Sequence, residues 1–195
     1  KINILENVFN VASLVWIVIS LALIMTLTII YIATMKEIKS SINIYENVYV
    51  SDKVKIPAVY GIVKPKIILP VNFQKSTVDY VLMHEKAHIK RKDNLFKLLS
   101  LIIVCFHWFN PFGWIMLKLF YSDIELACDE TVLSKCNDAQ KKEYAYTLLS
   151  SVEKTSVFLT SFGGAKIRVR IENILSYKRM SFISAFVFSN SLFSV

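Results

Sequence analysis

The sequence predicts a mainly α-helical membrane protein with one small β element, and three observations carry this prediction. Residues 11–34 form a run of 24 positions without a charged side chain. The composition is 54% hydrophobic with only 4 Gly and 4 Pro, and the mean hydropathy is +0.47, which is more apolar than an ordinary soluble domain of this length. The third observation is His-Glu-Lys-Ala-His at residues 84–88, a spacing that places two imidazoles on one face of a helix.

The charge-free run at residues 11–34 predicts a transmembrane helix, so the first expected partner is the lipid bilayer. As a helix it is about 36 Å long, enough to cross a hydrocarbon core of roughly 30 Å. It is too long for the apolar core of a cleaved signal peptide, which has about 7–15 residues. Because the chain begins at Lys1 and not at Met, we expect a fragment of a longer protein from which earlier spans are missing.

Basic residues lie mostly after this run, which predicts its orientation. Lys1 alone precedes the run, and the lysines and arginines that follow it within residues 35–95 are Lys36, Lys39, Lys53, Lys55, Lys64, Lys66, Lys75, Lys86, Lys90, Arg91 and Lys92. The positive-inside bias therefore places residues 35–95 in the cytoplasm of a multi-pass plasma-membrane protein. Attraction to the anionic inner leaflet accounts for the net charge of +8. We expect no direct nucleic-acid binding, because no helix-turn-helix or zinc-finger spacing accompanies the charge.

The second apolar stretch, residues 95–121, is expected to turn back on itself. Asn110-Pro111 interrupts it, and proline disfavours a helical residue before it and breaks the helical hydrogen-bond ladder. We predict a re-entrant helical hairpin, residues 95–109 inward and 112–121 back, with arms of about 15–22 Å that are too short to span the membrane. This hairpin belongs to a cytoplasm-facing domain at residues 35–180.

Two further segments complete the predicted organisation. Short runs of Val, Ile, Tyr and Pro at residues 48–66 predict two strands or a small β-hairpin. Residues 182–195 follow Lys178 and Arg179, and they are expected to begin a truncated outward-going span.

The segment around residues 84–88 reads as a helix with a metal-binding face. Ser76 or Thr77 can cap its start, and Asp79 lies in its first turn. His84 and His88 can both reach one Zn²⁺ ion, while Glu85 can take a proton from water that the ion activates. The residues themselves also allow a simpler reading, in which both histidines only pack or face solvent.

A zinc site of this type needs a third protein ligand, for which Glu125 is the best candidate. Glu125 and Asp129 are i and i+4 on a predicted helix, so one carboxylate can bind the metal and the other can accept the free N–H of a ligating histidine. We assign Glu125 to the metal and Asp129 to the histidine. The alternative is that both belong to a solvated acidic helix face. Cys128, beside them, is expected to be a buried thiol and not a ligand.

Several ordered motifs resemble the BlaR/MecR-type membrane metallopeptidases. They are His84-Glu85-Lys86-Ala87-His88 through Asn94, the segment 61–70, His107-Trp108-Phe109-Asn110-Pro111-Phe112, Glu125-Leu126-Ala127-Cys128-Asp129-Glu130 and Phe162-Gly163-Gly164. The resemblance covers residues 12–180 and implies an integral-membrane, gluzincin-like zinc peptidase that inactivates a transcriptional repressor in antibiotic-resistance signalling. The Glu125-to-Asp129 spacing is also similar to that of HtpX-type and CAAX-prenyl endopeptidases. The departure is that this sequence holds no penicillin-binding sensor domain.

Two alternatives to a regulatory zinc metalloendopeptidase stay open at this point. One is an HtpX-like housekeeping protease of membrane proteins, and the other is a non-catalytic signalling or scaffold module that retains the fold. The expected partner besides the lipid bilayer is a protein substrate.

Overall fold

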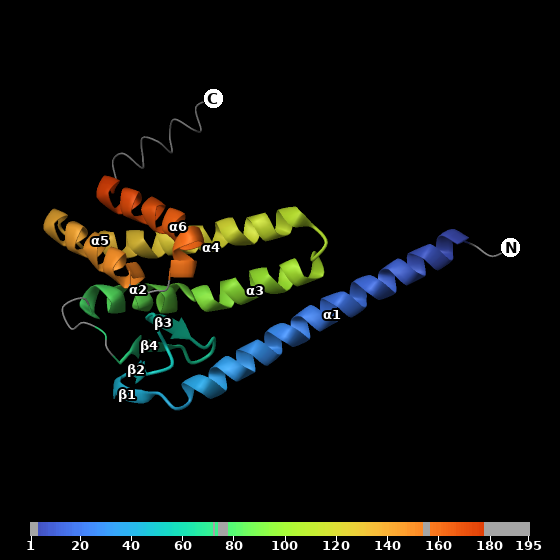
Figure 1. Ribbon diagram of the computed structural model, residues 1–195, viewed down its shortest axis with the longest axis horizontal. Coiled ribbons are helices and arrows are strands. Elements are labelled where there is room, and N and C mark those ends of the chain that lie inside the picture. The colour runs from blue at the N-terminus through green and yellow to red at the C-terminus, as the bar shows by residue number, and fades with distance from the viewer. Residues whose placement is uncertain (1–3, 72, 74–77, 154–156, 178–195) are drawn as a thin grey trace, which may run out of the picture. The chain divides into compact units, whose positions relative to one another are not determined.

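The computed structural model describes residues 4–71, 73, 78–153 and 157–177 (Figure 1). The expected cap at Ser76 or Thr77 and the expected span at residues 182–195 lie outside these residues. Contacts divide the chain into two units, Lys1–Cys128 and Asp129–Val195.

The first unit begins with α1, Ile4–Ile38, a helix of 35 residues that extends past both ends of the predicted run at 11–34. Of the helices that the structure describes, α1 is the one long and apolar enough to cross a membrane. Its apolar side chains are largely exposed, as a lipid-facing helix requires. One spanning helix near the N-terminus is therefore supported by length and composition.

A four-stranded sheet follows α1, where the sequence predicted only two strands between residues 48 and 66. The strands are β1 (Ile42–Tyr45), β2 (Val48–Ser51), β3 (Ala58–Tyr60) and β4 (Lys66–Pro70), in the order β1-β2-β4-β3. β2 pairs with β4 in parallel, and the other two pairs are antiparallel. The apolar run in β4 does not alternate, because three consecutive side chains in this central strand are buried.

The next element, α2 (Val78–Arg91), packs against this sheet. Val81 of α2 joins Val48, Ile67 and Leu69 of the sheet in one buried apolar cluster. This packing fixes α2 along one side, and its other buried residues are His84, Glu85, Ala87 and His88.

A helical hairpin follows, formed by α3 (Asp93–Phe106) and α4 (Pro111–Leu133) (Figure 1). The turn lies at Asn110-Pro111, where proline begins the second helix. The second arm has 23 residues, so it is longer than the predicted 112–121 and continues through the acidic segment without a break.

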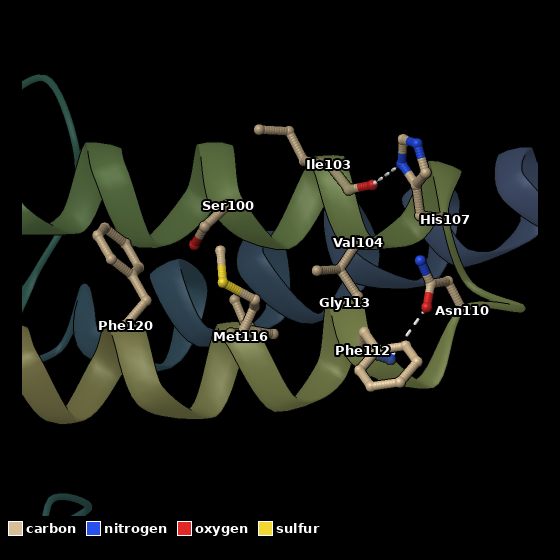
Figure 2. Close-up of a pocket in the computed structure, with 10 residues that line it drawn as sticks. Ser100, Ile103, Val104, His107, Asn110, Phe112, Gly113, Met116 and Phe120 are labelled. Atoms are coloured by element: carbon tan, nitrogen blue, oxygen red, sulfur yellow. Dashed lines mark hydrogen bonds between the residues drawn. The ribbon is translucent and has the colours of Figure 1, made fainter.

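Side chains satisfy the backbone groups at the tip of this hairpin. The indole of Trp16 in α1 donates to the carbonyl of Phe106 at 2.8 Å, and the indole of Trp114 donates to that of Trp108 at 3.0 Å. The side-chain oxygen of Asn110 accepts a hydrogen bond from the N–H of Phe112 at 3.0 Å (Figure 2). The last carbonyls of a helix have no partner within the helix. In lipid no water is present to bond them, and the indole N–H groups take that role.

Between the two arms lies a cavity of about 420 Å³, which Figure 2 shows from the side. Its lining includes Val104, Met116 and Phe120, with His107 at the tip end. The mostly apolar lining favours hydrocarbon over water.

The second unit contains α5 (Asp138–Glu153) and α6 (Val157–Ser176), which pack against each other. At the start of α5, Asn137 and Gln140 exchange two hydrogen bonds of 2.9 Å, a reciprocal cap of the helix. Tyr144, which is fully buried, donates to the carboxylate of Asp129 at 2.6 Å.

Candidate metal centre

Two imidazoles of α2 meet at their Nε2 atoms. His84 and His88 are four residues apart, and their Nε2 atoms lie 3.1 Å from each other with the rings at 85°. Both residues are buried, with 6% and 7% of their surface exposed. Two unprotonated nitrogens at this distance repel unless a cation or a shared proton lies between them.

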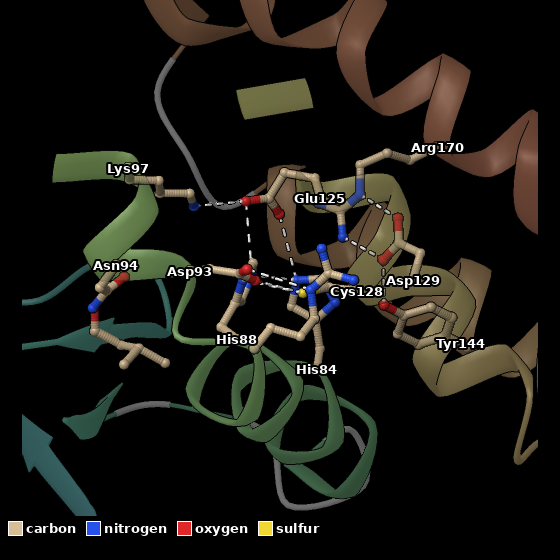
Figure 3. A network of polar contacts seen from close by, with 12 residues as sticks. His84, His88, Asp93, Asn94, Lys97, Glu125, Cys128, Asp129, Tyr144 and Arg170 are labelled. Atoms are coloured by element: carbon tan, nitrogen blue, oxygen red, sulfur yellow. Dashed lines mark hydrogen bonds and ion pairs between the residues drawn. The ribbon is translucent and has the colours of Figure 1, made fainter. Parts of the chain in front are cut away.

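Glu125 of α4 brings a carboxylate to the same point (Figure 3). Its Oε2 is 3.4 Å from His84 Nε2, and its Oε1 is 3.7 Å from His88 Nε2. Zinc–nitrogen bonds of about 2.0–2.1 Å in a tetrahedron place neighbouring donor atoms roughly 3.3–3.4 Å apart. The spacing of these three donors, two imidazoles and one carboxylate, therefore fits a single Zn²⁺ ion.

Asp93 sets the tautomer of His88. The Nδ1 atom of His88 lies 2.8 Å from Asp93 Oδ2, so Nδ1 carries the hydrogen and donates it to the carboxylate. The Nε2 atom is then left with a lone pair directed at Glu125 and His84. A carboxylate behind an imidazole also raises its strength as a ligand.

The backbone conformation of one residue, Lys92, places Asp93 beside His88. α2 ends at Arg91, and Lys92 has the left-handed torsions φ 57° and ψ 35° before α3 starts at Asp93. Asn94 then fixes the start of α3 to the sheet, because its amide donates to the carbonyls of Val59 and Gly61 at 3.0 Å each.

The thiol of Cys128 supports Asp93. Its Sγ atom is 3.1 Å from Asp93 Oδ2 and 3.2 Å from His88 Nδ1. Burial raises the pKa of Cys128 far above its usual value, and the hydrogen bond to Asp93 raises it further, so the thiol stays protonated and donates. Cys128, Asp93 and His88 form a second group of ligand type, but its members are engaged with one another through the protonated Nδ1.

Glu85 is buried one position away from His84, with 8% of its surface exposed. Burial raises its pKa above the ordinary value, and the neighbouring imidazoles of His84 and His88 partly oppose this. For Glu125, burial acts in the same direction, but its polar contacts with His84 and His88 and the charge of Lys97 outweigh it and hold its pKa below the ordinary value. Glu125 is therefore an anionic carboxylate at the candidate metal centre, and Glu85 holds a proton more readily than an exposed glutamate does.

Asp129 forms a bidentate ion pair with Arg170 in the second unit. Arg170 Nε and Nη2 each lie 2.7 Å from a different oxygen of the Asp129 carboxylate (Figure 3). The sequence predicted that Asp129 would accept the N–H of a ligating histidine, and for His88 the structure gives that place to Asp93. A role of Asp129 toward His84 stays a prediction.

Asp93 and Lys97 were not predicted from the sequence as residues of the site. Lys97 Nζ lies 3.1 Å from Glu125 Oε1, which joins α3 to α4 at the centre. Asp93 and Lys97 are i and i+4 on α3, so the spacing places both side chains on one face of that helix, but spacing alone does not bring this face to the ligands.

A buried His-Glu-x-x-His helix facing a carboxylate is the arrangement of a metallopeptidase. The chain matches the family described as BlaR1 peptidase M56 over residues 3–175, and it belongs to that family. It is 29% identical to "Regulatory protein BlaR1" of Bacillus licheniformis over 157 residues, which cover 73% of this chain and 26% of that relative.

Other relatives are similar over comparable ranges. The chain is 28% identical to the "Methicillin resistance mecR1 protein" of Staphylococcus aureus over 142 residues, 67% of this chain and 24% of the relative. It is 24% identical to "Regulatory protein BlaR1" of Staphylococcus aureus over 201 aligned positions, 87% of this chain and 34% of the relative. The chain thus spans about a quarter to a third of the length of these relatives.

Proposed function

We propose that this chain is the peptidase part of an integral-membrane zinc metalloendopeptidase whose active site faces the cytoplasm. The observation that carries the proposal is the convergence of His84, His88 and Glu125 within one coordination sphere, beside a buried Glu85. Membership of a peptidase family supports the same chemistry.

In this proposal His84, His88 and Glu125 hold the ion, and Asp93 keeps the proton of His88 on Nδ1. When bound, Zn²⁺ polarises a peptide carbonyl and lowers the pKa of a neighbouring water. Glu85 accepts a proton from the attacking water while the water oxygen bonds to the carbonyl carbon of the peptide. Glu85 then donates that proton to the amine nitrogen as the C–N bond breaks. Burial suits Glu85 to both tasks, because a raised pKa brings a carboxyl group nearer to neutral pH.

We further propose that the substrate is a cytoplasmic transcriptional repressor. The support is the resemblance to proteins whose names are "Regulatory protein BlaR1" and "Methicillin resistance mecR1 protein". These names favour a regulatory protease over a housekeeping one.

The bilayer placement is part of the same proposal. α1 would cross the membrane, and the α3–α4 hairpin would lie within it from the cytoplasmic side, with its tip in the lipid. The exposed aromatic residues Phe109 and Phe112 at this tip support the placement.

The test compares new protein N-termini in cells that produce the natural chain or its Glu85→Gln variant. We expect cleavage products that depend on Glu85, with a DNA-binding repressor among them. The exchange Glu130→Gln, at an exposed position of α4, is the matched control and should leave the products unchanged. Products restricted to membrane proteins would favour the housekeeping protease, and identical products from the Glu85→Gln variant would favour the non-catalytic module.

A further inference from the structure

We propose that Lys97 holds Glu125 in a one-oxygen binding mode, which keeps one coordination position of the metal open. This inference rests on the proposed function and assigns Lys97 as a positioning residue.

The two oxygens of Glu125 have different neighbours. Oε2 is the atom nearer to His84 Nε2, at 3.4 Å. Oε1 lies 3.1 Å from Lys97 Nζ and farther from its histidine, 3.7 Å from His88 Nε2. The carboxylate is thus divided between a ligand position at Oε2 and an ammonium partner at Oε1 (Figure 3).

Contacts with Tyr121 hold Lys97 beside Oε1 of Glu125. The aromatic ring of Tyr121 lies 5.9 Å from its ammonium, and the hydroxyl of Tyr121 donates to the Lys97 carbonyl at 3.0 Å. One turn earlier, Asn94 ties α3 to the sheet. Lys97 therefore projects from a helix whose position is fixed by these contacts.

The position of the pair at the centre points to its role. The side chains of Lys97 and Glu125 are 29% and 31% exposed, whereas those of His84 and His88 are each 8% exposed. The Lys97–Glu125 side is thus the more exposed side of the candidate centre. A hydrogen bond from an ammonium to a carboxylate is stronger than one between neutral groups, and partial burial reduces its screening by salt.

The chemical consequence concerns coordination number. Catalytic zinc sites have three protein ligands and keep the fourth position for water or substrate. If both oxygens of Glu125 bound the metal, protein atoms alone would supply four donors, and a water or peptide oxygen could bind only as a fifth donor. By engaging Oε1, Lys97 prevents this.

The test replaces zinc by Co²⁺, whose visible absorption reports the coordination number without any need for a substrate. We compare the purified natural chain in detergent with Lys97→Met, Lys97→Arg and the control Lys118→Met, which removes an exposed lysine of α4. Lys97→Met should keep about one bound ion, because three ligands remain. Its spectrum should shift toward the weaker absorption of a higher coordination number. Lys97→Arg should restore the natural spectrum, and Lys118→Met should not change it.

Hydrolysis gives a second readout. Loss of a group that orients a ligand typically costs about 10–100-fold in activity, so kcat of Lys97→Met should fall by that factor with little change in KM. An unchanged cobalt spectrum in Lys97→Met, or loss of the ion altogether, would overturn the inference while leaving the metallopeptidase proposal intact. Failure of the natural chain to bind Co²⁺ at all would overturn both.

Discussion

His88 Nδ1 and Asp93 Oδ2 lie 2.8 Å apart across the boundary between two helices. The contact fixes the imidazole ring of a candidate ligand, His88, on the side away from Nε2, and it is itself buried, since 2% of Asp93 is exposed. The orientation of the candidate metal centre therefore depends on α3 as much as on α2.

The first prediction concerns the metal itself. The purified chain should carry about one Zn²⁺, because three ligands of the right type converge. His84→Ala or His88→Ala should abolish binding, while Glu85→Gln should keep the ion and lose hydrolysis. Elemental analysis measures the zinc, and stoichiometric zinc in the double alanine variant would contradict the assignment of the ligands.

The second prediction ranks the carboxylates by their effect on zinc affinity. Glu125→Ala removes a ligand and should weaken binding most. Asp93→Asn should weaken it by about 10–100-fold, as expected for a partner of a ligating histidine. Asp129→Ala should have less effect than Glu125→Ala. Competition titration with a chelator measures the order, and a larger loss in Asp129→Ala than in Glu125→Ala would reverse the two roles.

The third prediction follows from the raised pKa of Glu85. In metal-free protein the folded state binds this proton more tightly than the unfolded chain does, so the free energy of unfolding falls as the pH rises from about 4.5 through the folded pKa. Glu85→Gln removes this penalty. The variant should therefore melt at a higher temperature than the natural chain at pH 7, and the difference should vanish below about pH 4. Calorimetry of both proteins without metal tests this, and equal melting temperatures at pH 7 would contradict it.

The fourth prediction concerns the ion pair in the second unit. Arg170→Met leaves the buried carboxylate of Asp129 without its guanidinium, and removal of one partner of a buried pair costs about 3–5 kcal/mol. The control is Arg168→Met, because Arg168 pairs with Glu172 in an exposed position and should contribute little. Chemical unfolding measures both. Equal stability of the two variants would show that the Asp129–Arg170 pair is not needed for folding.

The fifth prediction concerns topology. Cysteines introduced at Asp52 and Lys142, both exposed, should react only with reagents that reach the cytoplasm, in a background where the native cysteines are serine. The positive-inside bias and the shared metal centre independently require the same side. A cysteine at Phe109 should stay unreactive toward charged reagents added from the cytoplasm. Labelling of the cysteine at position 142 from outside the cell would contradict the hairpin placement. Residues 95–121 would then cross the membrane as a single span.

The sequence predicted the elements with strong periodicity or punctuation. The run at 11–34 indicated α1, and Asn110-Pro111 marked the turn between α3 and α4. The sheet was predicted only in part, because β1 is a short exposed edge and β4 lacks the alternation of a half-buried strand. Such strands differ little from loops or buried helical segments when only periodicity is read.

The candidate centre shows a similar division. His84, Glu85 and His88 follow from helical spacing alone, and Glu125 required only one long-range assumption. Asp93 could not be derived in this way, because its position depends on the torsion angles of Lys92. Lys97 reaches Glu125 from 28 residues away, a contact that no local pattern encodes.

The left-handed backbone of Lys92 makes the spacing between His88 and Asp93 intolerant of length changes. One residue inserted between His88 and Asp93 would rotate everything after it by about 100°, and Asp93 would face away from the imidazole. A β-branched residue at position 92 would resist the positive φ, whereas Gly or Asn would accept it. The four-residue interval can therefore serve as a search pattern, His-Glu-x-x-His-x-x-x-x-Asp, for other genomes. It selects chains whose histidine is oriented by the following helix, even where their overall similarity is too low to align.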